Sequence, residues 1–132
     1  MVVITRENLD EINKIYFHDA EISEVVSDYI EHTVKIPVKL YRKGSSGINA
    51  VITFENAVKL DISFLEPWGA GMYVLGAIAE PVEITSFKAE RLNVMDCFKV
   101  CFELNSGDEI NVVASKMVLV EEECQEVYIL HE

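Results

Sequence analysis

The sequence predicts a mostly β protein, because apolar and polar residues alternate in four separate stretches. These stretches cover residues 33–40, 50–55, 58–64 and 98–104. Successive side chains of a strand point to opposite faces, so each stretch would form a strand with one apolar and one polar face. Because the stretches follow each other closely along the chain, we expect an antiparallel sandwich or barrel with one short N-terminal helix.

The size and composition of the chain indicate one globular domain over residues 1–132. The chain has 132 residues, of which 50% are hydrophobic. This composition excludes intrinsic disorder as the main state, and the length is that of a usual domain. No apolar run approaches the roughly 18 residues that would span a bilayer. Residues 1–7 lack the basic start of a secretory signal, so we expect a cytoplasmic protein that does not bind membranes.

The charge of the chain bears on its partners. It carries 23 acidic and 11 basic residues, for a formal net charge of −12. Such a chain repels the phosphates of nucleic acids and anionic membrane surfaces, so neither is expected as a partner. Solubility is the simplest reason for the acidity. The alternative is a protein partner with a basic surface, since opposite charges speed the encounter of two proteins.

A short helix is expected over residues 6–15. Thr5 is a good N-cap, and Leu9, Ile12 and Tyr16 follow at helical spacing. Such an apolar stripe would pack on the sheet.

The strands are expected between clusters of turn residues. Their ranges are 21–28, 33–41, 49–55, 58–65, 96–104, 109–114, 117–120 and 126–130, with weaker candidates at 72–78 and 82–87. Residues 105–108, Asn-Ser-Gly-Asp, indicate a hairpin. Pro37 cannot donate to a strand ladder, so it implies an edge or a bulge. The apolar positions of these strands predict one core that contains Phe54, Leu60, Ile62, Phe98, Val100 and Phe102.

The cysteines are expected to be free thiols. Cys97 and Cys101 are four steps apart in a predicted strand, which separates them by about 13 Å. That distance is too long for a disulfide or for one shared metal ion. Cys124 completes an odd number, which is typical of reduced thiols. The histidines are dispersed, at His18, His32 and His131. We therefore expect neither a metal site nor a cofactor.

His18 and Asp19 form the first candidate site. A carboxylate beside an imidazole can orient the ring and raise its basicity, as in acid–base or metal pairs. However, adjacent side chains on extended backbone point apart, and no partner residue stands at a recognisable spacing. The sequence therefore favours a structural role, in which both residues end the helix and hydrogen-bond the turn into the first strand.

Residues 16–22, Tyr-Phe-His-Asp-Ala-Glu-Ile, carry a resemblance. They resemble the opening of small, uncharacterised bacterial β-rich proteins that begin with Phe-His-Asp-(Ala/Ser)-x-(Ile/Leu). Some such small acidic proteins are similar to immunity proteins that neutralise toxins. The resemblance implies no catalytic residues, but it implies a binding role.

The second candidate site is the loop from Glu66 to Tyr73, which holds the only tryptophan, Trp68. A tryptophan with flanking glycines is typical of pockets and of interaction hot spots. Alternatively, Trp68 plugs the open end of the sheet, because its neighbours Leu65, Met72 and Val74 are apolar. The spacing excludes a phosphate-binding loop.

Three functions follow from these observations. The leading one is a non-enzymatic protein-interaction module, in its sharpest form one that neutralises a toxin. The alternative is a small-ligand-binding β-barrel with a pocket near Trp68 and Tyr73. The third is a hydrolase or isomerase that uses His18, Asp19 and Glu66. Absence of catalytic motifs favours the first, and the oligomeric state is left open.

Overall fold

The computed structural model describes residues 1–41, 46–64, 73–82 and 96–122, and these form two antiparallel sheets. Sheet A has the order β1-β10-β5-β4-β2, and β3 also pairs with β4. Its strands are β1 (Val2–Ile4), β2 (Glu21–Ile22), β3 (Val26–Asp28), β4 (Thr33–Leu40), β5 (Ile48–Glu55) and β10 (Lys116–Glu121). Sheet B has the order β6-β9-β8-β7. Its strands are β6 (Lys59–Ile62), β7 (Val74–Pro81), β8 (Phe98–Leu104) and β9 (Glu109–Ala114).

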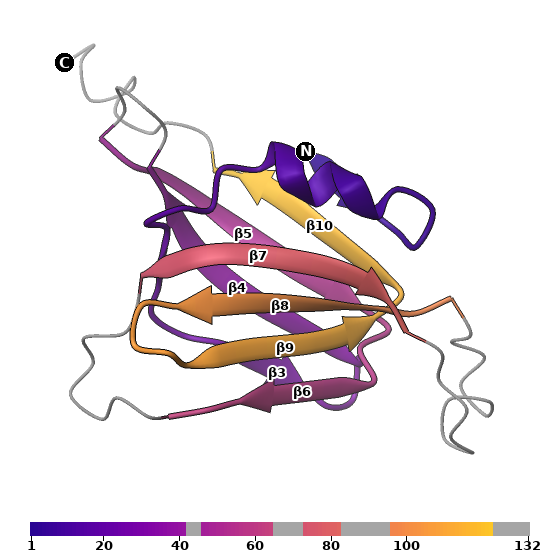
Figure 1. The fold of residues 1–132 in the computed structure, drawn as a ribbon. Coiled ribbons are helices and arrows are strands. Elements are labelled where there is room, and N and C mark those ends of the chain that lie inside the picture. The colour runs from indigo at the N-terminus through magenta and orange to yellow at the C-terminus, as the bar shows by residue number, and fades with distance from the viewer. Residues whose placement is uncertain (42–45, 65–72, 83–95, 123–132) are drawn as a thin grey trace, which may run out of the picture.

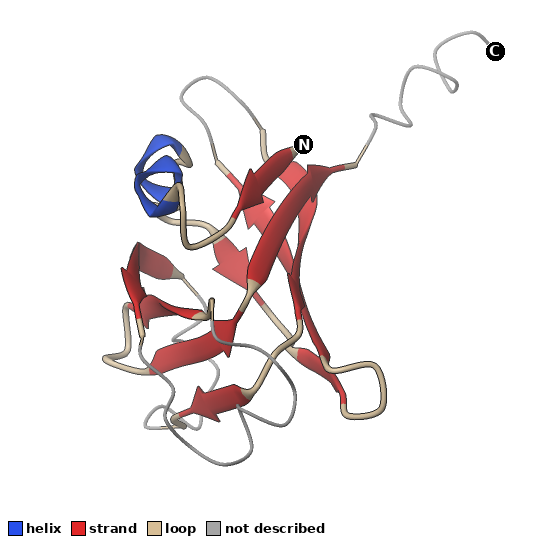
Figure 2. Cartoon of the chain, turned by 90° about the vertical axis from the view of Figure 1, so that its right-hand side faces the viewer, coloured by secondary structure: helices blue, strands red, loops and turns tan. Residues whose placement is uncertain are grey.

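The two sheets pack face to face as a sandwich. Sheet B lies in front of sheet A in Figure 1, and the side view of Figure 2 shows the two layers separately. The expected mostly β, antiparallel class is confirmed. The described strands form two sheets rather than one closed sheet, so the sandwich is the correct alternative and the barrel is not. Only Ser115 separates β9 of sheet B from β10 of sheet A.

The core lies between the sheets, as the alternation predicts. Phe54, Phe98, Val100 and Phe102 are fully buried in one cluster. The ring of Phe102 meets Phe54 edge to face at 6.4 Å between centroids. The other two predicted core residues, Leu60 and Ile62, are half-buried and pack against the same cluster. They lie on β6 at the edge of sheet B, which explains their partial exposure.

Pro37 lies where one side of β4 changes its partner. On that side, β2 pairs with Val38 and Lys39, while β3 pairs with residues 33–35. Neither strand pairs with Pro37 itself. The missing N–H of proline therefore falls at an interruption of the ladder, as expected.

The predicted α-helix is instead a short 3-10 helix, η1, over Leu9–Lys14. Thr5 is not its N-cap, because Val2–Ile4 form β1 and the amide of Thr5 donates to Asn8 Oδ1 at 2.7 Å. The apolar stripe does face the protein, since Ile12 is buried. Tyr16 lies beyond the helix and is exposed, so its assignment to that stripe was wrong.

The predicted strands are otherwise confirmed with shifted ends. The range 21–28 is split into β2 and β3, and 72–78 becomes the longer Val74–Pro81. Residues 105–108 do form the β8–β9 hairpin, in which Gly107 has a φ of 92°. Residues 83–87 and the range 126–130 lie outside the described residues. No helix among the described residues is long and apolar enough to cross a membrane.

Candidate functional site

Three of the five predicted site residues lie at one end of the sandwich. The amide of Asp19 donates to the carbonyl of Val74 at 2.8 Å, and the amide of Val74 donates to the carbonyl of Ala20 at 2.8 Å. The next residues along, Glu21 and Tyr73, form an antiparallel bridge. The segment that contains His18 and Asp19 is thus tied to Tyr73. Glu66 and Trp68 lie outside the described residues, so both roles proposed for Trp68 stay predictions.

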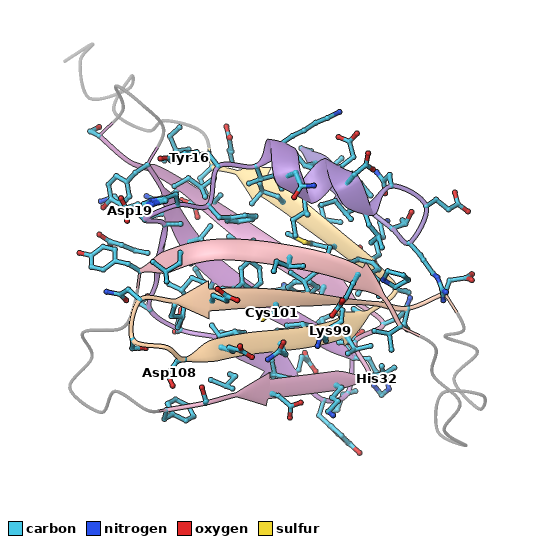
Figure 3. The ribbon with its side chains drawn as sticks, viewed as in Figure 1. Tyr16, Asp19, His32, Lys99, Cys101 and Asp108 are labelled. Carbon is cyan, nitrogen blue, oxygen red and sulfur yellow. The ribbon has the colours of Figure 1, made fainter. Side chains whose placement is uncertain are left out.

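Further aromatic and acidic side chains join these residues in what we call the aromatic–acidic patch. Its members are Tyr16, His18, Asp19, Glu21, Tyr41 and Tyr73. Tyr16 and His18 stack with their ring centroids 6.1 Å apart. The hydroxyl of Tyr41 donates to Glu21 Oε1 at 2.7 Å. Figure 3 shows Tyr16 and Asp19 together at this end of the molecule.

The geometry of His18 and Asp19 corrects two expectations. Their side chains do not point apart, since His18 Nδ1 lies 3.2 Å from Asp19 Oδ2. The reason is that Asp19 has a left-handed backbone, with a φ of 64°, instead of an extended one. They also do not end the helix, which stops four residues earlier at Lys14. The turn into β2 is closed by the amide of Ala20, which donates to the carbonyl of Phe17 at 2.9 Å.

The patch offers groups that attract cations. Tyr16 and Tyr73 are 55% and 39% exposed, so their rings are available to a partner. The hydrogen bond to Glu21 raises the pKa of Tyr41, with smaller contributions from burial and from the charge of Glu21, and keeps that phenol a donor. Lys39 Nζ already lies 5.8 Å from the centroid of the Tyr41 ring.

The sequence did not indicate a large cleft of the described structure. This cleft has a volume of about 640 Å³ and lies where the end of the β3–β4 hairpin meets β6 and the outer face of sheet B. Tyr29 and His32 line it from the hairpin, and Lys59, Lys99 and Val113 line it from sheet B. Figure 3 places His32 and Lys99 on the side opposite Tyr16 and Asp19. No motif marks the cleft, because the topology alone brings its segments together.

Two of the three cysteines lie in the described residues, and neither of these two forms a disulfide. Cys97 is fully buried, and Cys101 is half-buried on β8. Burial raises the pKa of both thiols, and the carboxylate of Glu109 adds to the rise at Cys101. Within the described residues, no group of three His, Cys, Asp or Glu side chains has the arrangement of a metal site.

We expect Cys101 to react slowly with alkylating reagents. The thiolate is the reacting form, so a raised pKa lowers the reactive fraction at any pH near the ordinary cysteine value of about 8.5. The rate should therefore reach its plateau at a higher pH than for a free thiol. Peptide-level mass spectrometry after timed iodoacetamide treatment measures this rate. Glu109→Gln should speed the reaction, whereas Glu7→Gln should not; equal rates in both variants would contradict the role of Glu109.

Comparison with known proteins gives little on function. No protein-family model matches the chain, and no curated relative was found. One solved structure is similar, that of an uncharacterized protein from Neisseria gonorrhoeae. The match has a TM-score of 0.49 and 10% identity, and it covers 82% of this chain and 94% of that chain. The function must therefore be inferred from the residues of this chain.

Proposed function

We propose that the protein is a non-enzymatic interaction module that binds a basic segment of a partner protein through the aromatic–acidic patch. The supporting observation is that tyrosines from three separate segments, Tyr16, Tyr41 and Tyr73, gather around Asp19 and Glu21. Tyrosine contributes large contact area with few rotatable bonds, and it is enriched where proteins bind each other.

The chemistry of the patch favours arginine and lysine in the partner. Carboxylates accept charge-assisted hydrogen bonds from both side chains, and tyrosine rings attract them through cation–π interactions. The net charge of −12 would speed the approach of a basic surface. A toxin with a basic active face is the sharpest form of this partner, in keeping with the resemblance of residues 16–22 to immunity-like proteins. The proposed location is the cytoplasm, where such an encounter would protect the cell.

The proposal is tested by removing the two charges of the patch without changing its shape. Asp19→Asn suits the left-handed backbone, and Glu21→Gln keeps an acceptor for the Tyr41 hydroxyl. The partner is first captured from host extract with the unmodified protein, then purified and titrated by calorimetry. Close charge pairs across interfaces contribute about 1.5 kcal/mol or more each, so the double variant should bind at least about tenfold more weakly.

A matched control separates local recognition from overall charge. Glu7→Gln with Glu31→Gln removes the same two charges from exposed sites outside the patch. This control should bind within about twofold of the unmodified protein, with an affinity that falls as salt is added. Equal weakening of both double variants would show that the patch is not the binding site.

A further inference from the structure

We infer that the cleft between the β3–β4 hairpin and sheet B binds a small amphipathic carboxylate, that is, an acid with an apolar body. This site lies outside the aromatic–acidic patch and does not depend on the proposed partner protein. Its volume of about 640 Å³ lies in the range of about 300–1,000 Å³ that is typical of small-molecule sites.

The lining of the cleft provides an apolar surface for the body of such a ligand. Val34 lines it from β4, and Val58, Leu60 and Val113 line it from the region of β6 and β9. Val113 is 7% exposed although it lies on the outer face of sheet B, where its register neighbour is Lys59. Neighbouring side chains, among them Cys97 and Val58, therefore cover much of Val113, which lies at the floor of the cleft.

Two lysines flank Val113, the part of this surface that lies on the outer face of sheet B. The register of sheet B aligns Lys99 of β8, Val113 of β9 and Lys59 of β6 in one row across the sheet. Neighbouring strands are about 4.8 Å apart, so the two lysine backbones are roughly 10 Å apart on either side of Val113. Both side chains line the cleft, and they are long and flexible enough to approach one anionic group above Val113.

The hydrogen-bonding capacity that is left in the cleft consists mainly of donors. Each lysine ammonium has three N–H groups. The Nζ atom of Lys59 lies 3.4 Å from Asp61 Oδ2, and that of Lys99 lies 3.5 Å from Glu80 Oε1. Both ion pairs are long, so they leave N–H groups of each ammonium to another acceptor. Within the described part of the chain, no hydrogen bond joins the ring nitrogens of His32 to another residue. The cleft thus has N–H groups that a carboxylate would satisfy.

Each of the three carboxylates that line the cleft has an internal partner, and that of Asp61 is Lys59. Asp28 Oδ1 accepts from the backbone amides of Ile30 and Glu31, at 3.1 and 3.0 Å. Glu109 Oε1 accepts from the side-chain amide of Asn111 at 3.3 Å. A cationic ligand would have to compete with these internal donors, whereas an anionic ligand would have to compete only with the two long ion pairs of Lys59 and Lys99.

The overall negative charge opposes an anion, and so do the three carboxylates that line the cleft, but each of these already has an internal hydrogen bond or ion pair. Charges farther away than about 8 Å are largely screened at physiological salt, while the two lysines act at contact distance. The apolar body supplies the remaining attraction by leaving water. A small inorganic anion, which has no apolar body, should therefore bind much more weakly than an apolar acid.

The test uses two probes of the same shape and opposite charge, 4-phenylbutyrate and 4-phenylbutylamine. Each is titrated at physiological salt into the isotope-labelled full chain, and amide chemical shifts are followed by NMR. The acid should give saturable shifts at β6, β9 and the hairpin around His32, with an affinity at least about tenfold above that of the amine. Such a ratio corresponds to one good charge-assisted contact.

Lysine variants show whether the charges of Lys59 and Lys99 cause the preference for the acid. Lys59→Gln with Lys99→Gln should lose at least about tenfold in affinity for the acid, because two charge-assisted contacts are removed. Lys14→Gln with Lys35→Gln makes the same change of net charge at exposed sites elsewhere and should have no comparable effect. Thermal melts of both variants check that they fold. Three results would overturn the inference: tighter or equal binding of the amine, no saturation by the acid at millimolar concentration, or equal affinity of the two lysine double variants.

Discussion

Replacing Phe102 with alanine is expected to lower the free energy of unfolding by about 3–5 kcal/mol. Its side chain is fully buried and contacts the rings of both Phe17 and Phe54. The ring of Phe17 lies edge to face, with its centroid 5.5 Å away. The truncation therefore leaves a cavity and removes two aromatic contacts that link sheet B to sheet A and to the segment before β2.

Urea denaturation followed by circular dichroism measures this loss. Phe64→Ala is the matched control, because the same side chain is removed at a position that is 82% exposed. The control should change the stability by no more than about 0.5 kcal/mol. A loss below about 1 kcal/mol for Phe102→Ala would show that β8 packs with its other face inward.

Replacing Asp108 with alanine is expected to cost about 2–3 kcal/mol, the second-largest effect. Asp108 is the one buried charged residue of the described chain, at 5% exposure. Its two carboxylate oxygens accept the hydroxyls of Ser63 and Ser106, at 2.8 and 2.7 Å. Ser63 Oγ in turn accepts the amide of Glu109 at 3.1 Å. Asp108 thus ties the end of β6 to the β8–β9 hairpin, and its removal breaks both of these charge-assisted hydrogen bonds.

The same denaturation experiment distinguishes this network from a simple surface charge. Asp61→Ala removes an exposed carboxylate that, within the described residues, forms an ion pair only with Lys59, so it should cost less than about 1 kcal/mol. Asp108→Asn keeps an acceptor and should lie between the two alanine variants. If Asp108→Ala and Asp61→Ala were equally stable, the carboxylate would have no structural role.

The fold class was predictable because a period of two can be read directly from the chain. The buried residues of β4 are Val34, Ile36, Val38 and Leu40, which are the apolar positions of its alternation. The β8–β9 hairpin was predictable from the turn residues at 105–108. In both cases the signal and the structure that it predicts lie within a few residues of each other.

The elements that were missed depend on distant contacts. β1 has three residues, too few to show alternation, and it forms only because β10 provides an edge more than a hundred residues away. η1 starts at Leu9 rather than at residue 6, because β1 takes residues 2–4 and a turn closed by the amide of Asn8 and the carbonyl of Thr5 follows it. Helical spacing cannot show that the preceding residues are used by a sheet.

The candidate site was predictable in its residue types but not in its geometry. His18 and Asp19 were singled out as one candidate and Tyr73 as part of another, and only the backbone pairing of residues 19–21 with Tyr73 and Val74 shows that they meet. The contact between His18 and Asp19 depends on a positive φ, which nothing in the sequence demands. The cleft could not be foreseen at all, since Lys59 and Lys99 become neighbours of Val113 only through the register of sheet B.

The position of β10 between β1 and β5 has a consequence for synthesis on the ribosome. β4 and β5 can pair as soon as both have left the ribosome, but the other edge of β5 has no partner until β10 follows, about 60 residues later. At roughly 5–20 residues per second, this interval lasts about 3–12 s. During that time the nascent chain presents an apolar strand with a free edge, to which another nascent chain could add. Slow elongation between β5 and β10 would therefore lower the yield of folded protein, even though the finished sandwich pairs this edge of β5.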